Sequence, residues 1–321
     1  MTDVAARTSG PFPIGLDDLP ELNALFSEAF SERYRRDGMS GVRVPPLNPA
    51  IWRFAIEGAG DGAMLWRDGM GRIAAFNLAH VSGREGWMGP LAVREEVQGR
   101  GIGRMVVRTG IDHLKRAGCT VIGLETMPRT MDNIGFYASL GFAPARLTIT
   151  LTLEAGGSGT DEPELLSTAG SAERGSLIAE CAALTARVRP GGDYSRELAL
   201  TLRHALGDAV LLRDAAGMLE GFALFHDVPL VEGRSRDELR VLKLVVADVV
   251  RLGALTSALR AQARRSGTLR AAVRMQGEYR SAFSALVADG ARVRWTDLRM
   301  TLSGYEESVP SPGIALSNWE I

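Results

Sequence analysis

The sequence predicts an α/β protein with mixed sheets, built from two similar domains. Strand-like and helix-like segments alternate through both halves, and several stretches of the first half recur in the second in the same order. A short polar segment rich in glycine separates the halves. The chain of 321 residues suits two domains of about 150 residues each. We therefore expect domains at residues 1–153 and 164–321, joined by a linker at residues 154–163.

Hydrophobic periodicity and breaker residues predict the elements of the first half. Helical spacing of apolar residues, ended by glycine or proline, predicts helices at residues 16–36, 50–57, 103–117 and 133–140. Alternating or continuous apolar runs predict strands at residues 63–67, 72–81, 87–93, 120–126 and 147–153. Residues 42–49 contain three prolines and are expected to form a loop.

A weak internal repeat relates the two halves. The segment Leu65–Asp68 recurs as Leu211–Asp214, and Ala74–His80 recurs as Glu220–His226, at the same separation. Each repeat is long enough to be a domain, so the pattern predicts a tandem pair and not a solenoid.

Composition excludes several functional classes. Apolar residues make up 45% and charged residues 23% of the chain, and the net charge is −1, so nothing favours binding to nucleic acid. No apolar run reaches the length of a membrane span, and the N-terminus lacks a secretory pattern. The two cysteines and four histidines show no disulfide or metal-ligand spacing, namely Cys119, Cys181, His80, His113, His204 and His226. We expect a cytoplasmic protein without a metal.

A glycine-rich turn is the most informative feature of the sequence. The apolar strand that ends in Leu91-Ala92-Val93 runs into Gln98–Arg104, where Gly99, Gly101 and Gly103 alternate before a helix. Such a turn directs free backbone N–H groups and the helix dipole at one point, which suits a pyrophosphate. Arg104 stands where a dinucleotide-binding fingerprint needs its third glycine, and the lysine of a Walker A loop is missing. A tight glycine turn without a ligand is the alternative.

Two motifs together resemble a known family. The stretch Gln98-x-x-Gly101-x-Gly103 resembles the acetyl-CoA motif of the GNAT superfamily of N-acetyltransferases. Further along, Phe136-Tyr137-Ala138-Ser139-Leu140-Gly141-Phe142 resembles the second signature of that family. The resemblance covers roughly residues 12–153 and implies a GNAT fold there. Through the repeat, it implies a tandem arrangement with a degenerate GNAT-like domain in the second half.

The resemblance also implies a binding site for acetyl-CoA as co-substrate. Backbone groups would hold the pyrophosphate at Gln98, Gly99, Arg100, Gly101, Ile102, Gly103 and Arg104. The pantetheine arm would lie between Leu91, Ala92, Val93 on one strand and Glu125, Thr126, Met127 on the next. Asn133 would bind the arm, or it caps the following helix.

Tyr137 is the expected general acid. A tyrosine is protonated at neutral pH and can donate a proton to the departing thiolate, as GNAT tyrosines at this place commonly do. The alternative for Tyr137 is an ordering contact with the sulfur. Glu125 resembles the glutamate base of ribosomal-protein N-terminal acetyltransferases, with Glu85 as a weaker candidate and a water chain as another possibility.

These features predict transfer of an acetyl group to a primary amine by direct attack. A non-catalytic acyl-CoA sensor or scaffold and a mycothiol-synthase-like transferase are the alternatives. The acceptor is not readable, although residues 16–36, residues 42–49 and the second domain would surround it, with Arg43, Trp52 and Arg53 among them. Both a monomer and a homodimer remain open. A last hypothesis places Glu320 or the terminal carboxylate near the site.

The second domain is expected to bind no acetyl-CoA. At the place of the glycine turn it has Asp248–Ala254, with Gly253 as its single glycine and four residues fewer than the first half. The position that matches Tyr137 falls at about Ala285. One acetyl-CoA per chain is therefore expected.

Overall fold

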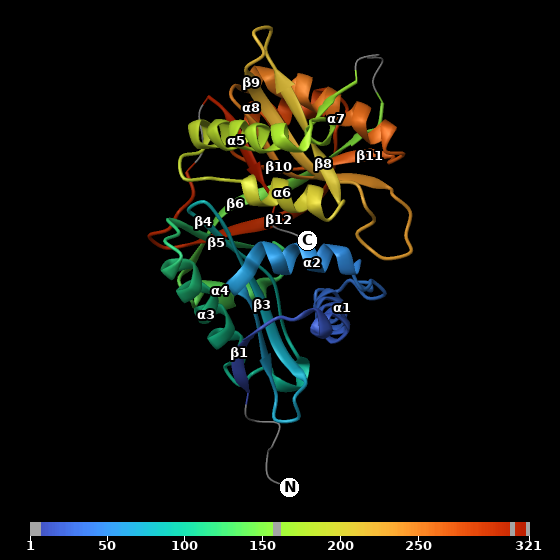
Figure 1. Cartoon of the computed structure of the whole chain (residues 1–321). Coiled ribbons are helices and arrows are strands. Elements are labelled where there is room, and N and C mark those ends of the chain that lie inside the picture. The colour runs from blue at the N-terminus through green and yellow to red at the C-terminus, as the bar shows by residue number, and fades with distance from the viewer. Residues whose placement is uncertain (1–7, 157–161, 309–311, 319–321) are drawn as a thin grey trace.

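The computed structural model describes residues 8–156, 162–308 and 312–318 (Figure 1). In the first half, the strands are β1 (Ser9–Pro13), β2 (Ala63–Arg67), β3 (Ile73–Ser82), β4 (Glu85–Val93), β5 (Val121–Thr126) and β6 (Phe142–Glu154). The helices are α1 (Leu19–Arg36), α2 (Pro49–Ala59), α3 (Ile102–Arg116) and α4 (Met131–Ala138), with short 3-10 turns η2 (Leu16–Asp18), η3 (Gly60–Gly62) and η4 (Glu95–Val97).

The second half repeats this order. Its strands are β7 (Glu164–Leu165), β8 (Gly207–Arg213), β9 (Leu219–His226), β10 (Glu238–Val246), β11 (Arg270–Gln276), β12 (Arg292–Leu302) and β13 (Ile314–Ser317). Its helices are α5 (Ser171–Val188), α6 (Ser195–Arg203), α7 (Leu252–Arg265) and α8 (Arg280–Ala288), with 3-10 turns η5 (Leu166–Thr168) and η6 (Val249–Arg251). The fold is therefore mixed α/β in both halves, as the sequence predicts.

The elements of the first half agree closely with the sequence pattern. Every predicted helix and strand is present, with ends that differ by a few residues. Two differences stand out: the last strand begins at Phe142 and not at Leu147, and no hydrophobic pattern predicts the strand at Ser9–Pro13. The latter strand is exposed and rich in proline and glycine, so it carries no hydrophobic alternation for a pattern to detect.

One sheet runs through the whole molecule because the halves exchange their last strands. The strand order is β1-β2-β3-β4-β5-β12-β6-β11-β10-β9-β8-β7, with β13 paired to β10. Strand β12 of the second half is inserted between β5 and β6 of the first, and β6 is inserted between β12 and β11 of the second. Each half therefore completes its sheet with a strand from the other.

Helices cover both faces of each half of the sheet. In the first half, α1 and α2 pack on one face, where Leu22, Leu25 and Trp52 join a buried cluster. The amphipathic helix α3 packs on the other face through Val106, Val107 and Leu114. In the second half, α5 and α6 cover one face and α7 and α8 the other, so the two halves have the same layered design.

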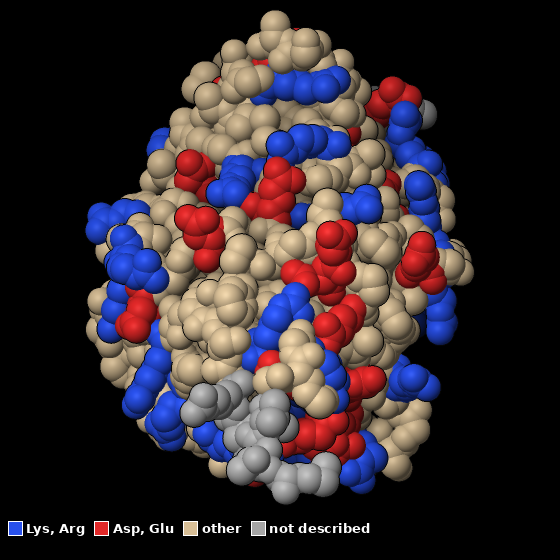
Figure 2. All heavy atoms as spheres, turned by 60° about the horizontal axis from the view of Figure 1, so that its bottom comes forward, with Lys and Arg blue, Asp and Glu red and all other residues tan. Residues whose placement is uncertain are grey.

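The surface carries charges of both signs. On the face shown in Figure 2, basic and acidic side chains alternate and form no large region of one sign. Within the described residues, no helix is long and apolar enough to cross a membrane.

Candidate acyl-CoA site

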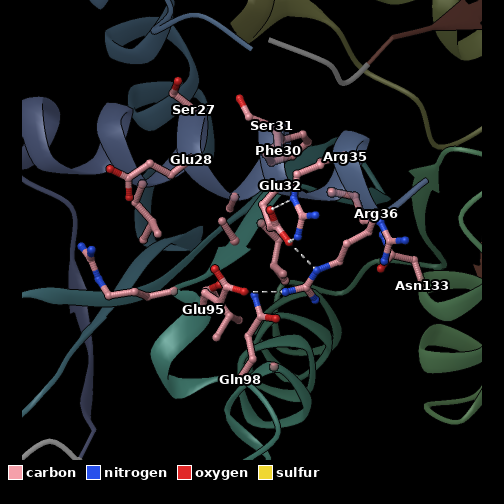
Figure 3. Close-up of a pocket in the computed structure, with 18 of the residues that line it drawn as sticks. Ser27, Glu28, Phe30, Ser31, Glu32, Arg35, Arg36, Glu95, Gln98 and Asn133 are labelled. Carbon is pink, nitrogen blue, oxygen red and sulfur yellow. Dashed lines mark hydrogen bonds and ion pairs between the residues drawn. The ribbon is translucent and has the colours of Figure 1, made fainter. Parts of the chain in front are cut away.

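A cavity of about 910 Å³ opens between α1, the end of β4, the turn that follows it and the start of α4 (Figure 3). Ten of the predicted binding residues line it: Leu91, Ala92, Val93, Gln98, Gly99, Gly101, Gly103, Arg104, Asn133 and Tyr137. The tertiary structure thus brings the glycine turn, the strand end and the second motif together around one space. Arg100, Ile102 and Thr126 do not line it, and the last two are buried.

The glycine turn has the backbone that the chemistry requires. Gly99 and Gly101 have φ values of +76° and +84°, which side chains with a Cβ rarely adopt. A Cβ at either position would meet no atom within 4 Å, so the space beside the turn is open to a ligand. Gly101 is the N-cap of α3 and accepts the first bond of the helix from the Met105 N–H. Among the described residues, the amides of Gly101–Arg104 donate to no acceptor, and Gly101, Gly103 and Arg104 line the cavity, so free donors are available beside it.

Glycine is needed at position 103 for a different reason, which is close packing. A Cβ at Gly103 would lie 3.4 Å from Phe136 Cζ, so glycine there lets α3 approach the second motif closely. Arg104 reaches the same motif, where its guanidinium donates to Ser139 Oγ at 3.2 Å. The two motifs are therefore packed against each other, and Gly103 serves helix packing as well as access for a ligand.

The strands beside the turn separate where the pantetheine arm is expected. Strands β4 and β5 pair in parallel from Glu85↔Val121 to Met88↔Leu124 and no further. Beyond Met88, the segment Leu91–Val93 lines the cavity and no longer pairs with β5. The edge of β4 that faces β5 is thus left for a ligand at this point.

Tyr137 lies in the same cavity, on α4. Its ring packs against Phe136 and Phe142, with centroids 5.2 Å and 6.2 Å away, which fixes its direction. Burial raises the pKa of Tyr137 to about 12, so its hydroxyl is protonated at neutral pH. Among the described residues, the hydroxyl has no hydrogen-bond partner. It is therefore available as a donor toward a ligand in the cavity.

Glu125 lies in a different environment from the one expected of a base. Its carboxylate accepts from Thr148 Oγ1 at 2.5 Å, from Arg299 at 2.8 Å and from Arg274 at 2.5 Å. Burial alone would raise the pKa of Glu125, but the two guanidinium charges outweigh it and the pKa is lowered. The carboxylate does not line the cavity. This geometry favours an ion-pair role at the junction of the halves over proton abstraction.

The weaker candidate, Glu85, is likewise engaged. Its carboxylate pairs with Arg189 of the second half, and both side chains are buried. Arg189 in turn pairs with Glu307, which also binds Arg299 at 2.7 Å. Burial would raise the pKa of Glu307, but Arg299 and Arg189 lower it to about 2. A continuous network of buried charges thus joins the two halves behind the cavity.

Helix α1 forms the opposite wall, which sequence reasoning assigned to the acceptor side without naming its polar residues. Arg36 bridges Glu32 and Glu95 at 2.8 Å each, and Gln98 lies beside this group (Figure 3). Glu28 also lines the cavity. Glu28, Glu32 and Arg36 fall on the polar face of the amphipathic helix α1, so periodicity alone could not distinguish them from a solvated surface.

Of the residues expected on the acceptor side, one lines the cavity and another does not. Arg43 lines the cavity, whereas Trp52 is fully buried in the core under α1 and cannot contact a substrate. The loop is fixed to α1 by the Ser31 hydroxyl, which accepts from the Val44 N–H at 2.9 Å. The second half also reaches it, because the Asn48 N–H donates to the Leu230 carbonyl at 2.9 Å.

The matching cleft of the second half is closed. Strands β10 and β11 pair only from Glu238 to Arg240, and β13 then pairs with β10 from Lys243 to Val246. The C-terminal strand therefore fills the place that the pantetheine arm would take in the first half. The turn is absent too, because η6 ends at Arg251 and α7 begins at Leu252.

The residue in place of Tyr137 needs a small correction. Both α4 and α8 end before a glycine with φ above +90°, Gly141 and Gly290. Aligning these glycines places the buried Leu286, and not Ala285, at the position of Tyr137. The second half thus lacks a proton donor at this place.

These features define a class of protein. A parallel strand pair that opens beside a glycine turn, followed by a tyrosine on the next helix, is the acyl-CoA site of the GNAT fold. Residues 21–142 match the model of the acetyltransferase (GNAT) family. The first half of the chain is therefore a domain of the GNAT family.

Curated relatives resemble only part of this domain. The [ribosomal protein bS18]-alanine N-acetyltransferase of Salmonella typhimurium is 36% identical over 76 residues, which is 24% of this chain and 51% of the relative. The same enzyme of Escherichia coli is 32% identical over 77 residues, or 24% of this chain and 52% of the relative. The chain thus spans about half the length of the curated relatives it matches.

Solved structures resemble the whole chain. A candidate acetyltransferase from Pyrococcus horikoshii aligns with a TM-score of 0.67 at 16% identity, over 97% of this chain and 94% of that one. A tandem GNAT protein from the clavulanic acid biosynthesis pathway aligns with a TM-score of 0.59 at 13% identity, over 94% and 100%. At these identities the likeness concerns the fold, which is that of two tandem GNAT-like halves.

Proposed function

We propose that this protein is an N-acetyltransferase that moves an acetyl group from acetyl-CoA to a primary amine. One observation carries the proposal: the glycine turn, the open edge of β4 and the Tyr137 side chain all line one cavity. A glycine turn without a ligand would not need an open strand and a protonated tyrosine in the same space. Family membership of residues 21–142 supports the same assignment.

Each part of acetyl-CoA has a matching group in the cavity. The free amides of Gly101–Arg104, at the N-terminus of α3, suit the pyrophosphate. The backbone of Leu91–Val93 suits the amide groups of the pantetheine arm, which would pair with it as an added strand does. Asn133 lines the cavity near the start of α4 and suits a polar contact with the arm. The thioester would then lie towards Met88, where β4 and β5 come together.

The chemistry needs two proton transfers. The acceptor nitrogen attacks the acetyl carbon, a C–N bond forms and the C–S bond breaks, and coenzyme A leaves as a thiolate. Tyr137 would donate its proton to that thiolate, and its raised pKa keeps it protonated until then. The amine must lose one proton in the same reaction. Because Glu125 and Glu85 are held in ion pairs, we propose that neither carboxylate takes this proton.

The second half would serve the acceptor side. Its own cleft is filled by β13, so we propose that one acetyl-CoA binds per chain. Its loop before β10 is bonded to the loop at residues 42–49, and this contact would wall the acceptor groove. We propose that residues 1–153 and 164–321 are the two repeated units of the sequence. They are not separate bodies in space, because β6 and β12 each lie in the part of the sheet formed by the other unit.

A screen for thiol release tests this function. The full chain is incubated with acetyl-CoA and one representative each of four acceptor classes: a small amine, an aminoglycoside, an amino acid and a peptide with a free N-terminus. The curated relatives bear the name [ribosomal protein bS18]-alanine N-acetyltransferase, so an alanine-initiated peptide is included. We expect amine-dependent thiol release with at least one class. Stoichiometric acetyl-CoA binding without release would instead favour the sensor or scaffold.

A further inference from the structure

The last turn of α1 contacts both sides of the open cleft. On one side, Arg36 Nη2 donates to Glu95 Oε1 at 2.8 Å, and Glu95 belongs to η4, which leads into the glycine turn. On the other side, the hydroxyl of Thr130, the N-cap of α4, donates to Asp37 Oδ2 at 2.9 Å. Arg36 is the last residue of α1, and Asp37 is its C-cap. The helix expected on the acceptor side therefore also reaches the place where acetyl-CoA is expected.

The residues before the glycine turn bring negative charge to this place. Glu95 and Glu96 are exposed, and both line the cavity just ahead of the turn whose free amides suit a diphosphate. A diphosphate is negatively charged at neutral pH, so an uncompensated carboxylate beside it opposes its binding. Among the described residues, Arg36 is the ion-pair partner of Glu95, and Glu96 has none. Arg36 is thus the group that compensates the charge of Glu95.

Glu32 holds the Arg36 side chain in this position. Arg36 Nε donates to Glu32 Oε1 at 2.8 Å, and the Arg35 guanidinium donates to the same carboxylate at 2.7 and 2.6 Å. The hydrogen bonds from Arg35 and Arg36 lower the pKa of Glu32 to about 2, so Glu32 stays charged at neutral pH. Figure 3 shows the Arg36 guanidinium between Glu32 and Glu95, with Gln98 beside them. The arginine is therefore fixed where α1 meets the glycine turn.

The Arg36–Glu95 pair is too exposed to matter much for folding. The two side chains are 40% and 66% exposed, and ion pairs of this kind contribute little to the free energy of unfolding. The same pair stands beside the expected position of a multiply charged ligand. A change of one unit in the charge there alters the affinity for such a ligand directly. A role in ligand binding therefore explains the pair better than a role in stability.

We propose that Arg36 is a positioning residue of the acetyl-CoA site, which neutralises Glu95 and thereby allows the glycine turn to accept the diphosphate. The inference rests on the proposed function, and it assigns the last turn of α1 to the donor side of the cleft. Arg36 acts through Glu95 and not by contact with a phosphate. Coenzyme A also carries a 3′-phosphate, but the free amides of Gly101–Arg104 suit the diphosphate, so this is the group concerned.

Calorimetry on the full chain at low ionic strength tests the proposal. Arg36→Gln should raise Kd for acetyl-CoA about fivefold, because it leaves Glu95 uncompensated. Arg36→Lys keeps the charge, and Arg36→Gln/Glu95→Gln removes both charges, so each should stay within about twofold of wild type. Salt at about 0.5 M should reduce the effect of Arg36→Gln, because it screens exposed charges.

The second half offers a matched control. Arg265 is the last residue of α7, as Arg36 is of α1, and its guanidinium lies 2.6 Å from a Glu162 carboxylate oxygen. The two side chains are 45% and 74% exposed, and neither lines the cavity. Arg265→Gln thus removes the same charge from a similar pair, and it should bind acetyl-CoA as wild type does.

Two shortened ligands identify the phosphate involved. The 3′-dephospho form of acetyl-CoA keeps the diphosphate, so Arg36→Gln should weaken its binding by the same factor. S-acetylpantetheine has no phosphate, and ligand-observed NMR should show equal binding to wild type and Arg36→Gln. An effect that disappears with the dephospho form overturns the assignment to the diphosphate. An equal loss of S-acetylpantetheine binding would show a structural change and also overturn it.

The outcomes separate this inference from the proposed function. A wild type that binds no acetyl-CoA contradicts acetyl transfer itself. A wild type that binds acetyl-CoA, together with an unchanged Kd in Arg36→Gln, contradicts the role of Arg36 alone. A double variant that binds as weakly as Arg36→Gln also contradicts this role, because Arg36 would then act on the ligand without Glu95.

Discussion

The two clefts of this molecule are built on the same fold, but the first is open and the second is filled by a strand. In the first half, β4 and β5 part after Met88, and a glycine turn with free amides stands at the mouth of the opening. In the second half, β10 and β11 part after Arg240, and β13 occupies the opening. A strand can take this place because it offers backbone groups to the same edge that a pantetheine arm would use.

The comparison shows which features make a cleft into a binding site. The parting of the strands is common to both halves, so it belongs to the fold. The four residues Gln98–Gly101 stand between η4 and α3, whereas η6 and α7 are contiguous. Without this turn the second half has no cluster of free backbone N–H groups for a pyrophosphate. Leu286 stands there in place of the tyrosine. The site is therefore a local addition to a shared frame.

The largest expected effect comes from separating the halves. A fragment of residues 1–160 keeps β6 but loses β11 and β12, so β6 loses both of its neighbours and β5 keeps only its short pairing with β4. We expect no cooperative thermal unfolding and no acetyl-CoA binding from this fragment, measured by circular dichroism and calorimetry. Co-expression with residues 161–321 should restore both. A folded, monomeric fragment that binds acetyl-CoA would show that strand exchange is dispensable.

The next effect concerns the turn that distinguishes the clefts. Gly101 has a φ of +84° and open space beside it, and asparagine and aspartate tolerate this conformation better than other residues. Gly101→Asp should abolish acetyl-CoA binding in calorimetry, because it adds a negative charge beside the pyrophosphate. Gly101→Asn has the same shape without the charge. Its Kd for acetyl-CoA should therefore be at least about tenfold lower than that of Gly101→Asp.

A matched change in the second half is the control. Gly253 lies in the first turn of α7, and Gly253→Asp should leave the stoichiometry at one per chain. A stoichiometry of two in the wild type would contradict the difference between the clefts.

Tyr137 gives the third test of the comparison. Tyr137→Phe removes the hydroxyl but keeps the ring between Phe136 and Phe142. We expect kcat for thiol release to fall about 10²–10⁴-fold with little change in KM for acetyl-CoA. Tyr305→Phe, a half-buried tyrosine outside the cavity, should keep wild-type kcat. A near-normal kcat in Tyr137→Phe would assign this ring to packing.

The smallest effect involves the two equivalent histidines, which both halves bury at the end of matching strands. Burial lowers the pKa of His80 to about 4 and that of His226 well below its ordinary 6.5. Below pH 6.5 the unfolded chain therefore binds more protons than the folded one, and the free energy of unfolding falls as the pH falls. Each histidine contributes up to about 1.4 kcal/mol per pH unit.

Urea unfolding between pH 7 and pH 5 measures this slope. His80→Gln and His226→Gln should each reduce it, and by similar amounts if the halves are equivalent in this respect. A free energy of unfolding that does not change over this range would contradict the burial of neutral histidines. A slope that one variant alone reduces would show that the two positions differ.

Much of the fold could be predicted from the sequence, because its signals are local. The helices and strands of the first half follow from periodicity within single segments, and the pairing of Gln98–Gly103 with Phe136–Phe142 indicates the cleft. The weak repeat likewise indicates the layered design of the second half. The missing turn between Arg251 and Leu252 is also a local feature, and its absence is readable from the spacing of the repeat.

The expectation that Glu125 acts as a base shows the limit of reasoning from local sequence. Its neighbours on the chain resemble those of a catalytic glutamate, yet its partners Arg274 and Arg299 lie 149 and 174 residues away. Only the exchange of β6 and β12 brings them together. The C-terminal hypothesis stays a prediction, because Glu320 lies outside the described residues; Ile314–Ser317 forms the strand that fills the second cleft.

The sequence by itself determined the elements, the glycine turn and Tyr137, because backbone conformation and motif spacing depend on neighbours along the chain. The tertiary structure decided which strands exchange, which carboxylates are neutralised, which cleft is filled and where Lys243 meets Glu197. Those outcomes depend on strand order and on electrostatic contacts between distant residues. No local pattern encodes them, since a buried charge acquires its partner only when the halves pack together.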